Sequence, residues 1–462
     1  MQKNPLLFLS SKPIVRFQYL GNNQTVLEII EEVKRGLIDG LRSLEHATGW
    51  DDPTEESAQS LWTCVEVCKS LIESSEPIYN LEGILEKLHT EMIEVDGLKG
   101  WESESVPGAI STYFTSDVGL LYQSIGRGEE LQTVLNTLYR MQNPDGGWGV
   151  CNGDLVSRTR STGSPLRLYA KCMDSPWAFK MINWDSYSSA IDWLTKAQND
   201  DDGGWGNLSD LMPSDLTATN LALNAILSSK IALRKYPNLK LPIRDSMIAL
   251  GIKKLIKMGK NGSWRGVSEE FRINSPTAFY GKFRHTASGT GTLTALQVLC
   301  KAARLGYLKE DQTIIALGLN DIIQRSVSYS TANGKWLVPS DQNGPPTAWN
   351  SAFALDAFLE FQRLYLEYHT KGIVDVGLTS RIVVREKIWQ SISVVLSSII
   401  FFLTLAPKLT FLDIYVSWYN SQNAWTQGIL ITFIGIFTER IASFSFSFLR
   451  KNIIRDKKTR NE

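Results

Sequence analysis

Cysteine and histidine are scarce in this sequence, which excludes two common ways of stabilising or equipping a domain. The five cysteines are an odd number without paired Cys-x-x-Cys spacing, so we expect no disulfide scaffold and a reducing compartment. The four histidines lie far apart, and no set of Cys, His and Asp ligands for zinc can be assembled around them. We therefore predict neither a metal site nor a cofactor.

The sequence also lacks a net charge. Its 462 residues include 48 basic and 48 acidic side chains, so no global field would attract nucleic acid. Hydrophobic residues make up 43% of the chain, which is enough apolar area for folding and excludes a disordered protein. The N-terminal segment has only a short Leu-Leu-Phe-Leu patch at 6–9, which is not typical of a secretion signal.

Long uncharged runs are confined to the C-terminal part. Residues 388–406 carry no charge and are long enough to cross ~30 Å of hydrocarbon as a helix. A second candidate span, 424–448, is interrupted by Glu439 and Arg440, so an interfacial helix is its alternative. Lys and Arg flank this pair, which predicts an integral membrane protein whose large N-terminal part and basic tail, 450–462, face the cytoplasm.

A tryptophan behind a glycine or small polar turn recurs along the rest of the chain. Successive tryptophans are 47 to 72 residues apart, which is the length of a helical hairpin with its loops. Apolar residues at i, i+3, i+4 and i+7 before the tryptophans predict outer amphipathic helices, and more apolar runs after most of them predict inner helices. The six tryptophans are Trp50, Trp101, Trp148, Trp205, Trp264 and Trp336.

Hairpins of this kind bury both faces when they close into two concentric rings. We therefore predict an all-α fold, an (α/α)6 toroid of six helical hairpins at 26–370, after an N-terminal extension at 1–25. A linker at 371–387 and a two-helix transmembrane hairpin at 388–449 follow it. An open solenoid is the alternative, but it needs polar capping repeats, and the first repeat is no more polar than the others.

In two repeats a glutamine precedes the turn, so that Gln142 leads to Trp148 and Gln198 to Trp205. These segments fit the pattern Q-x(2–5)-G-x-W and resemble the repeats of the prenyltransferase and squalene–hopene cyclase superfamily, over roughly residues 26–366. The resemblance implies a toroid around an apolar cavity. It also implies structural roles for the repeat residues, because Gln and Trp tie one outer helix to the next repeat in that superfamily.

Terpene cyclases of this superfamily that start by protonation use D-x-D-D at the start of an inner helix. The corresponding stretch here, residues 213–218, resembles that motif but keeps only the middle aspartate, Asp215. Asp215 is therefore a candidate acid without its usual tuning partners. A Ser-Asp pair before an apolar helix is also an ordinary N-cap, and Asp117 stands in a similar place in another repeat, so both interpretations stay open for both aspartates.

Other candidates have equally plain structural alternatives. His285 is a candidate base or a hydrogen-bonded buried histidine. Tyr113 and Trp349 lie near inner-helix starts, where an aromatic face stabilises a carbocation or packs in the core. Three arginines, placed in a long loop after Trp148, would grip a diphosphate or be solvated: Arg158, Arg160 and Arg167.

Three functional hypotheses follow. The first is a membrane-anchored terpene-cyclase or prenyltransferase-like protein that takes an apolar, isoprenoid-type ligand from the bilayer, with Asp215 as the proton donor. The second is a catalytically degenerate toroid that serves as a membrane-anchored recognition or scaffold module. The third is a toroid that cleaves glycans with paired carboxylates. Whether the protein is an enzyme stays open, and the sequence predicts no particular protein partner.

Overall fold

The structure is a computed structural model. It describes residues 26–46, 49–50, 61–103, 106–207, 213–259, 262–264, 268–274, 280–286, 290–308, 313–328, 336–339 and 346–370. The chain divides after Ile382 into two units, and every described residue belongs to the first. The predicted linker, transmembrane hairpin and basic tail lie outside the described residues.

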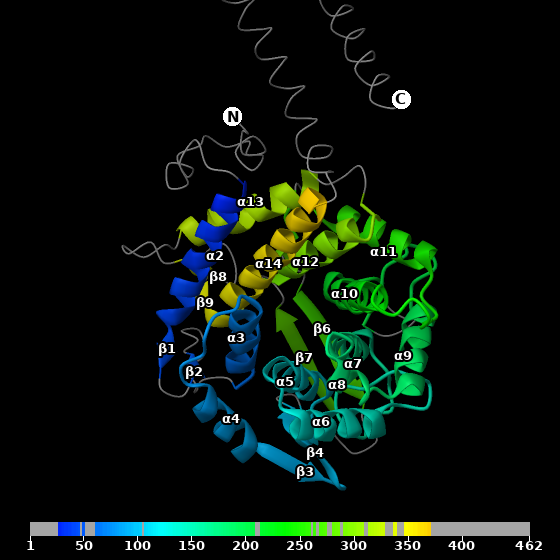
Figure 1. The fold of residues 1–462 in the computed structure, drawn as a ribbon. Helices are drawn as coiled ribbons and strands as arrows, with labels where there is room; N and C mark the ends of the chain where they lie inside the picture. Colours follow the sequence, from blue (N-terminus) through cyan, green and yellow to red (C-terminus); the bar gives the residue numbers. More distant parts are fainter. Residues whose placement is uncertain are drawn as a thin grey trace, which may run out of the picture. The chain divides into compact units, whose positions relative to one another are not determined.

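The described part of the chain forms a double ring of helices (Figure 1). Each inner helix contacts the next, and the last contacts the first, so the inner ring is closed. Its helices are α3 (Leu61–Glu73), α5 (Thr112–Ile125), α7 (Thr159–Cys172), α10 (Leu216–Leu233), α12 (Thr290–Arg304) and α14 (Ala348–Thr370). The outer helices are α2 (Val26–Arg42), α4 (Leu81–Thr90), α6 (Gly128–Met141), α9 (Trp184–Lys196), α11 (Asp245–Met258) and α13 (Thr313–Ser328), and a short helix, α8 (Pro176–Phe179), precedes α9.

Burial separates the two rings as the apolar spacing predicts. On outer helix α6, six of fourteen residues are buried, and they follow the i, i+3, i+4, i+7 pattern. On inner helix α7, eleven of fourteen residues are buried, since this helix has neighbours on nearly every side. The (α/α) toroid predicted from the sequence is therefore confirmed, and the open solenoid is wrong.

The recurring tryptophan fastens each outer helix to the loop that follows it. In five repeats the indole Nε1–H donates a hydrogen bond to the carbonyl oxygen of a leucine near the end of the preceding outer helix. These bonds join Trp50 to Leu41 at 3.1 Å, Trp101 to Leu88 at 2.8 Å, Trp148 to Leu138 at 2.7 Å, Trp205 to Leu194 at 2.8 Å and Trp264 to Leu255 at 2.7 Å. All five indoles are at most 2% exposed, so each bond satisfies a buried donor.

The two glutamines of the fuller motif reach the next repeat. Gln142 Nε2 donates to the carbonyl oxygen of Ser186 on α9 at 2.9 Å, and Gln198 Nε2 donates to that of Met247 on α11, also at 2.9 Å. Each glutamine therefore joins the end of one repeat to the first turn of the following outer helix. This is the structural role that the superfamily resemblance implies for both residues.

The sixth tryptophan closes the ring by a different contact. Trp336 packs against α2 of the first repeat, where its backbone N–H donates to the Gly36 carbonyl at 3.0 Å. A Cβ atom at Gly36 would lie 2.9 Å from the Trp336 ring, and one at Gly40 would lie 1.9 Å from the Trp336 carbonyl oxygen. The absence of a side chain at these two glycines therefore lets the last repeat pack directly against α2.

Short antiparallel strands connect several helices, although strand signals are scarce in the sequence. Strands β3 (Met92–Val95), β4 (Leu98–Ser103) and β5 (Val106–Ile110) form a three-stranded sheet. The remaining strands form pairs: β1 (Glu45–His46) with β2 (Gly49–Trp50), β6 (Ser268–Asn274) with β7 (Tyr280–Thr286), and β8 (Val338–Pro339) with β9 (Pro346–Thr347). The β6–β7 hairpin leads into α12, so it belongs to the end of the toroid where the inner helices begin.

The prediction of an integral membrane protein with a cytoplasmic toroid and tail is wrong. Across the ranges that the structure describes, no helix is both long enough and apolar enough to cross a bilayer. The longest of these helices, α14, has 23 residues but carries Asp356, Glu360 and Arg363, which would be costly in hydrocarbon. The transmembrane hairpin at 388–449 therefore receives no support.

We expect Trp148→Ala to lower the free energy of unfolding by about 3–5 kcal/mol, because it leaves a large buried cavity and an unpaired Leu138 carbonyl. Trp148→Phe keeps most of the packing and loses mainly the hydrogen bond, so its cost is about 1–2 kcal/mol. Urea denaturation followed by circular dichroism measures both. Tyr79→Phe, at a residue that is 79% exposed, is the control and changes stability by less than about 0.5 kcal/mol. Equal losses for the two Trp148 variants would contradict the packing argument.

Candidate functional site

A cavity of about 370 Å³ lies on the axis of the toroid, between the C-terminal halves of the inner helices. Its wall takes residues from, or just after, all six of these helices. Seven cationic side chains line it: Lys69, Arg167, Lys171, Lys235, Lys301, Arg304 and Arg363. Four carboxylates join them, namely Glu73, Asp174, Asp356 and Glu360. The predicted apolar character of the toroid cavity is therefore not what this part of the axis shows.

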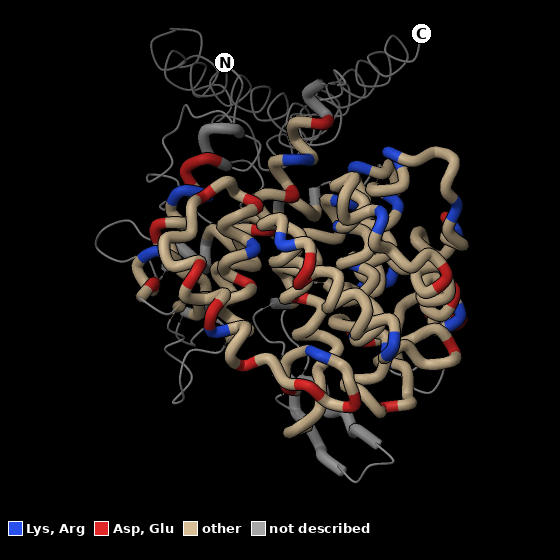
Figure 2. Tube along the Cα trace, turned by 60° about the horizontal axis from the view of Figure 1, so that its bottom comes forward, with Lys and Arg blue, Asp and Glu red and all other residues tan. Residues whose placement is uncertain are grey.

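The excess of cationic over anionic side chains is confined to this cavity, since the whole chain has 48 of each. Figure 2 shows Lys and Arg interspersed with Asp and Glu along the described part of the chain. Five of the inner helices end beside the cavity, and their C-terminal carbonyl groups carry partial negative charge that favours nearby cations. At one end of the cavity lies Lys69, whose side chain is 9% exposed, and its rim includes Lys235, whose side chain is 53% exposed.

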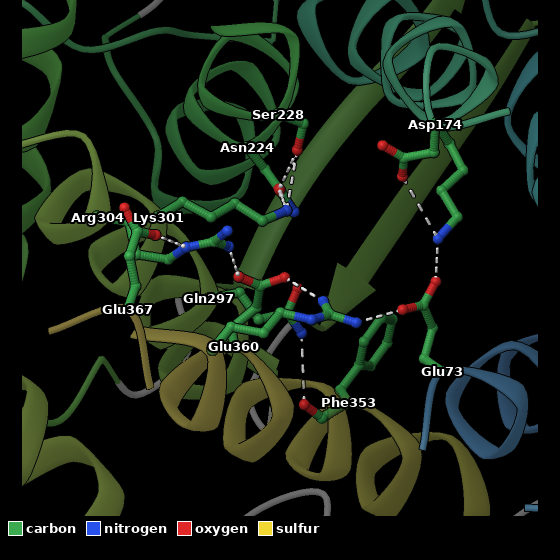
Figure 3. Close-up of polar contacts among 12 residues, drawn as sticks. Glu73, Asp174, Asn224, Ser228, Gln297, Lys301, Arg304, Phe353, Glu360 and Glu367 are labelled. Carbon is green, nitrogen blue, oxygen red and sulfur yellow. Dashed lines mark hydrogen bonds and ion pairs between the residues drawn. The ribbon is translucent and has the colours of Figure 1, made fainter. Parts of the chain in front are cut away.

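A chain of ion pairs runs around the rim and joins neighbouring inner helices (Figure 3). Glu73 on α3 binds both Lys171 on α7 and Arg363 on α14. Glu360 accepts from Arg363 at 2.6 Å and from Arg304 on α12 at 3.1 Å. The network ties the ends of four inner helices together and commits these carboxylates to structural contacts.

Lys301 is held differently from the paired cations. Its Nζ lies 2.6 Å from Asn224 Oδ1 and 2.9 Å from Ser228 Oγ, both on α10 (Figure 3). No ion pair joins it to a carboxylate of the described residues, whereas Arg304, one turn further along α12, binds two. Burial, together with the nearby Arg167, Arg363 and Arg304 cations, lowers the pKa of Lys301 to about 8 despite Glu360.

Arg167, which the sequence analysis places in a loop, lies in the third turn of α7, half-buried in the cavity wall. Within the described residues it forms no ion pair or hydrogen bond. Burial disfavours the guanidinium cation, but the carboxylates of Asp117, Glu66 and Asp356 outweigh that effect, so the pKa of Arg167 is raised. Its guanidinium donors are therefore available to the cavity.

The inner end of the cavity is a compact ionic cluster. Lys69 Nζ donates to Glu66 on the same helix at 2.6 Å and to Asp117 on α5 at 3.0 Å. Burial disfavours the Lys69 ammonium, but the Asp117 and Glu66 carboxylates outweigh it, so the pKa of Lys69 is raised. Asp117, a candidate acid in the sequence, is therefore fully buried and bound to an ammonium, and it lies inside α5 rather than at its N-cap, which is Ser111.

Asp215 occupies the N-cap of α10, where its Oδ1 accepts a hydrogen bond from the backbone N–H of Ala218 at 2.6 Å. Arg160 on α7 lies 3.9 Å from the same oxygen. Burial raises the pKa of Asp215, although Arg160 and backbone N–H groups oppose that effect. Asp215 thus serves the capping role that the sequence left open, and its role as an acid stays a prediction.

The predicted aromatic residues gather around one that the sequence did not single out. The ring centroid of Trp62 on α3 lies 6.3 Å from that of Tyr113 on α5 and 5.8 Å from that of Trp349 on α14. Trp62 Nε1 also donates to Asp117 Oδ2 at 3.3 Å. Tyr113 and Trp349 therefore share one cluster beside the inner ionic group, near the starts of their helices.

The other predicted residues lie elsewhere. Arg158, at the N-cap position of α7, is 2% exposed, and its Nε lies 3.4 Å from Asp154 Oδ2, so it belongs to the core. His285 lies in strand β7, on the hairpin before α12. Among the described residues no group of His, Cys, Asp and Glu side chains has metal-ligand geometry.

Most of the cavity residues are not among the candidates predicted from the sequence, because several of those candidates lie near helix starts. A signal was nonetheless present. Glu66, Lys69 and Glu73 recur at i, i+3 and i+7 within an otherwise apolar helix, and α14 carries a similar set, Asp356, Glu360 and Arg363. Charges at helical spacing inside a buried helix indicate a polar axis rather than a solvated face.

No protein-family model matches the chain, and no curated protein does. Among solved structures, a glycoside hydrolase family 76 mannosidase from Bacteroides thetaiotaomicron is similar, with a TM-score of 0.50 and 10% identity over 74% of this chain and 100% of that one. An alpha-1,6-mannanase of family 76 from Salegentibacter sp. HEL1_6 has a TM-score of 0.48 and 9% identity, over 73% and 99%. A possible member of family 105 from Salmonella enterica has a TM-score of 0.46 and 11% identity, over 77% and 100%.

At these identities the likeness shows the fold alone. The chain shares its toroid fold with this glycoside hydrolase, and no comparison supports the family resemblance drawn from the Gln and Trp motifs beyond the fold. A terpene-cyclase activity is not supported.

Removing the Glu73 charge tests the ion-pair network. Burial alone would raise the pKa of Glu73, but Lys171 and Arg363 outweigh it and lower the pKa to about 2. A carboxyl group with a depressed pKa contributes stability that is present above its unfolded-state pKa and is lost as the pH falls toward the folded value. We expect Glu73→Gln to cost about 1–3 kcal/mol at pH 7, and the difference from the wild type to shrink between about pH 4.5 and 2.

Denaturant unfolding at a series of pH values measures this difference. Glu82→Gln is the matched control, since Glu82 pairs with Arg127 at 3.2 Å but its side chain is 82% exposed, and its effect is below about 0.5 kcal/mol. A Glu73→Gln effect that is independent of pH would contradict the assignment.

Proposed function

We propose that the protein binds a small polar ligand of the carbohydrate class in the axial cavity. The observation that carries this proposal is the charged lining of the cavity, with contributions from all six inner helices. At about 370 Å³ the cavity lies within the usual range of small-molecule sites. Its rim reaches solvent at Lys235, so a ligand can enter from water.

An apolar occupant fits this lining poorly. A hydrocarbon chain in the cavity would strip water from charged groups without replacing their hydrogen bonds, which costs several kcal/mol for each group left unpaired. A polyhydroxylated ligand supplies both donors and acceptors. The isoprenoid-type ligand expected from the superfamily resemblance is therefore the weaker candidate for this cavity.

The fold supports the carbohydrate class as an analogy. The mannosidase of glycoside hydrolase family 76 acts, by its name, on a mannoside, and it shares the toroid over its whole length. Fold alone does not determine function, so this likeness favours the ligand class and does not identify the sugar.

The carboxylates at the inner end of the cavity favour binding over hydrolysis. Glycoside hydrolysis needs two carboxyl groups on either side of the scissile bond. Glu66 and Asp117 are close enough to share the Lys69 ammonium, but that ammonium occupies the space between them. For Asp215 the structure supports a capping role, because its Oδ1 accepts from the backbone N–H of Ala218.

Calorimetric titration of the full chain with monosaccharides and manno-oligosaccharides tests the proposal, with squalene in mixed micelles as the apolar comparison. We expect saturable binding of at least one saccharide and none of squalene. Asp215→Asn is the companion variant, since asparagine caps a helix as well as aspartate. It should leave saccharide affinity within about twofold of the wild type. Squalene binding with turnover that Asp215→Asn abolishes would overturn the proposal in favour of a cyclase.

A further inference from the structure

The axial cavity contains two kinds of cation. Arg167 and Lys301 form no ion pair with the described residues, and both line the wall of this one cavity. Adjacent unpaired cations in one cavity wall repel each other unless an anion lies between them. The other lining cations each form an ion pair with a described carboxylate: Lys69, Lys171, Lys235, Arg304 and Arg363.

The ends of the inner helices do not account for this pair. A cation in the last turn of a helix is stabilised by the terminal carbonyl groups, and Lys301 lies in the last turn of α12. Arg167 does not share that stabilisation, because α7 continues for more than one turn beyond it and ends at Cys172. The effect of the helix dipole falls off within one turn, so the Arg167 charge depends instead on the nearby carboxylates of Asp117, Glu66 and Asp356, although it forms a direct ion pair with none of them.

The two cations also differ in how they are held. Lys301 is fixed by neutral acceptors, because Asn224 Oδ1 and Ser228 Oγ on α10 both accept from its Nζ. Arg167 has no such acceptor among the described residues, and its guanidinium group forms part of the cavity wall. Lys301 is thus held in place before any ligand binds, whereas the guanidinium donors of Arg167 remain for a ligand in the cavity.

We infer that Arg167 and Lys301 anchor an anionic group, a carboxylate or a phosphate, on the polar ligand of the axial cavity. This inference rests on the proposed function and narrows its ligand to acidic or phosphorylated saccharides. Arg167 presents a planar fork of donors that suits two oxygens of such a group, and Lys301 adds a point charge. The paired cations at the rim are already neutralised and contribute mainly to structure.

Pairs of saccharides that differ mainly in one anionic group distinguish binding of the charge from binding of the sugar. We expect galacturonate to bind more tightly than galactose, or glucose 6-phosphate more tightly than glucose, by at least tenfold in calorimetric titrations with the full chain. Inorganic phosphate, used alone, should bind weakly and compete. Arg167→Met and Lys301→Met should each weaken binding of the charged ligand about tenfold or more and leave the neutral sugar within about threefold.

Two further variants guard against misfolding and unspecific charge effects. Arg167→Lys keeps the charge but not the fork, so it should recover part of the lost affinity. Lys196→Met removes an outer-helix cation whose side chain is 75% exposed, and it should leave every affinity unchanged. Thermal unfolding confirms that each variant is folded before it is titrated.

Proton uptake on ligand binding tests the role of Lys301, because a lysine with only a structural role would take up no protons when the ligand binds. Lys301, with its pKa of about 8, faces Arg167, Arg304, Arg363 and Glu360. A bound anion stabilises the charged ammonium, so binding near pH 8 takes up protons, and affinity falls by up to about tenfold per pH unit above 8. Titrations in buffers of different ionisation enthalpy measure this uptake, which Lys301→Met should abolish.

The outcomes distinguish the two proposals. Equal binding of charged and neutral saccharides, unaffected by Arg167→Met, would overturn the anion anchor and leave the proposed function standing. Binding of inorganic phosphate without any saccharide would support the anchor and overturn the carbohydrate class. No binding of any of these ligands by the folded wild type would overturn both.

Discussion

The hydrogen bond from a buried indole N–H to a leucine carbonyl is the contact on which the toroid depends. It occurs in five repeats with nearly the same geometry, from Trp50 to Trp264. Each bond satisfies a carbonyl group at the end of an outer helix, and the indole fills the space between that helix and the loop. The same bond recurs from repeat to repeat, and the inner helices form a closed ring in which residues of all six line one cavity.

The residues on the inward faces of these helices determine the charge and the hydrogen-bonding groups of the axial cavity. In a closed ring the inner helices are covered on all sides, so their polar residues have only one another and the cavity as neighbours. Glu73 and Glu360 satisfy cations across helix boundaries, and Lys69 lies between two carboxylates. Arg167 and Lys301 line the same cavity without a direct ion pair to a described carboxylate, so their donors remain for an anion on the ligand.

The sequence predicts the repeats and the two rings because the tryptophan spacing and the apolar periodicity are local signals. It also places Asp215 at the start of an inner helix, where it caps α10. The charged cavity depends on which inward residues of distant helices meet, such as Glu73 with Arg363, 290 positions apart. Patterns within a short stretch of sequence do not predict contacts between residues so far apart. The expectation of an apolar cavity came from family resemblance and not from the inner helices themselves.

The contact of Trp336 with Gly36 bears on how the chain acquires its structure. The first outer helix leaves the ribosome long before the loop that will cover its two glycines has been made. At about 5–20 residues per second, that helix waits tens of seconds with an apolar stripe exposed. Nascent toroids therefore pass through a period in which an incomplete ring presents an edge that another molecule, such as a chaperone, can occupy.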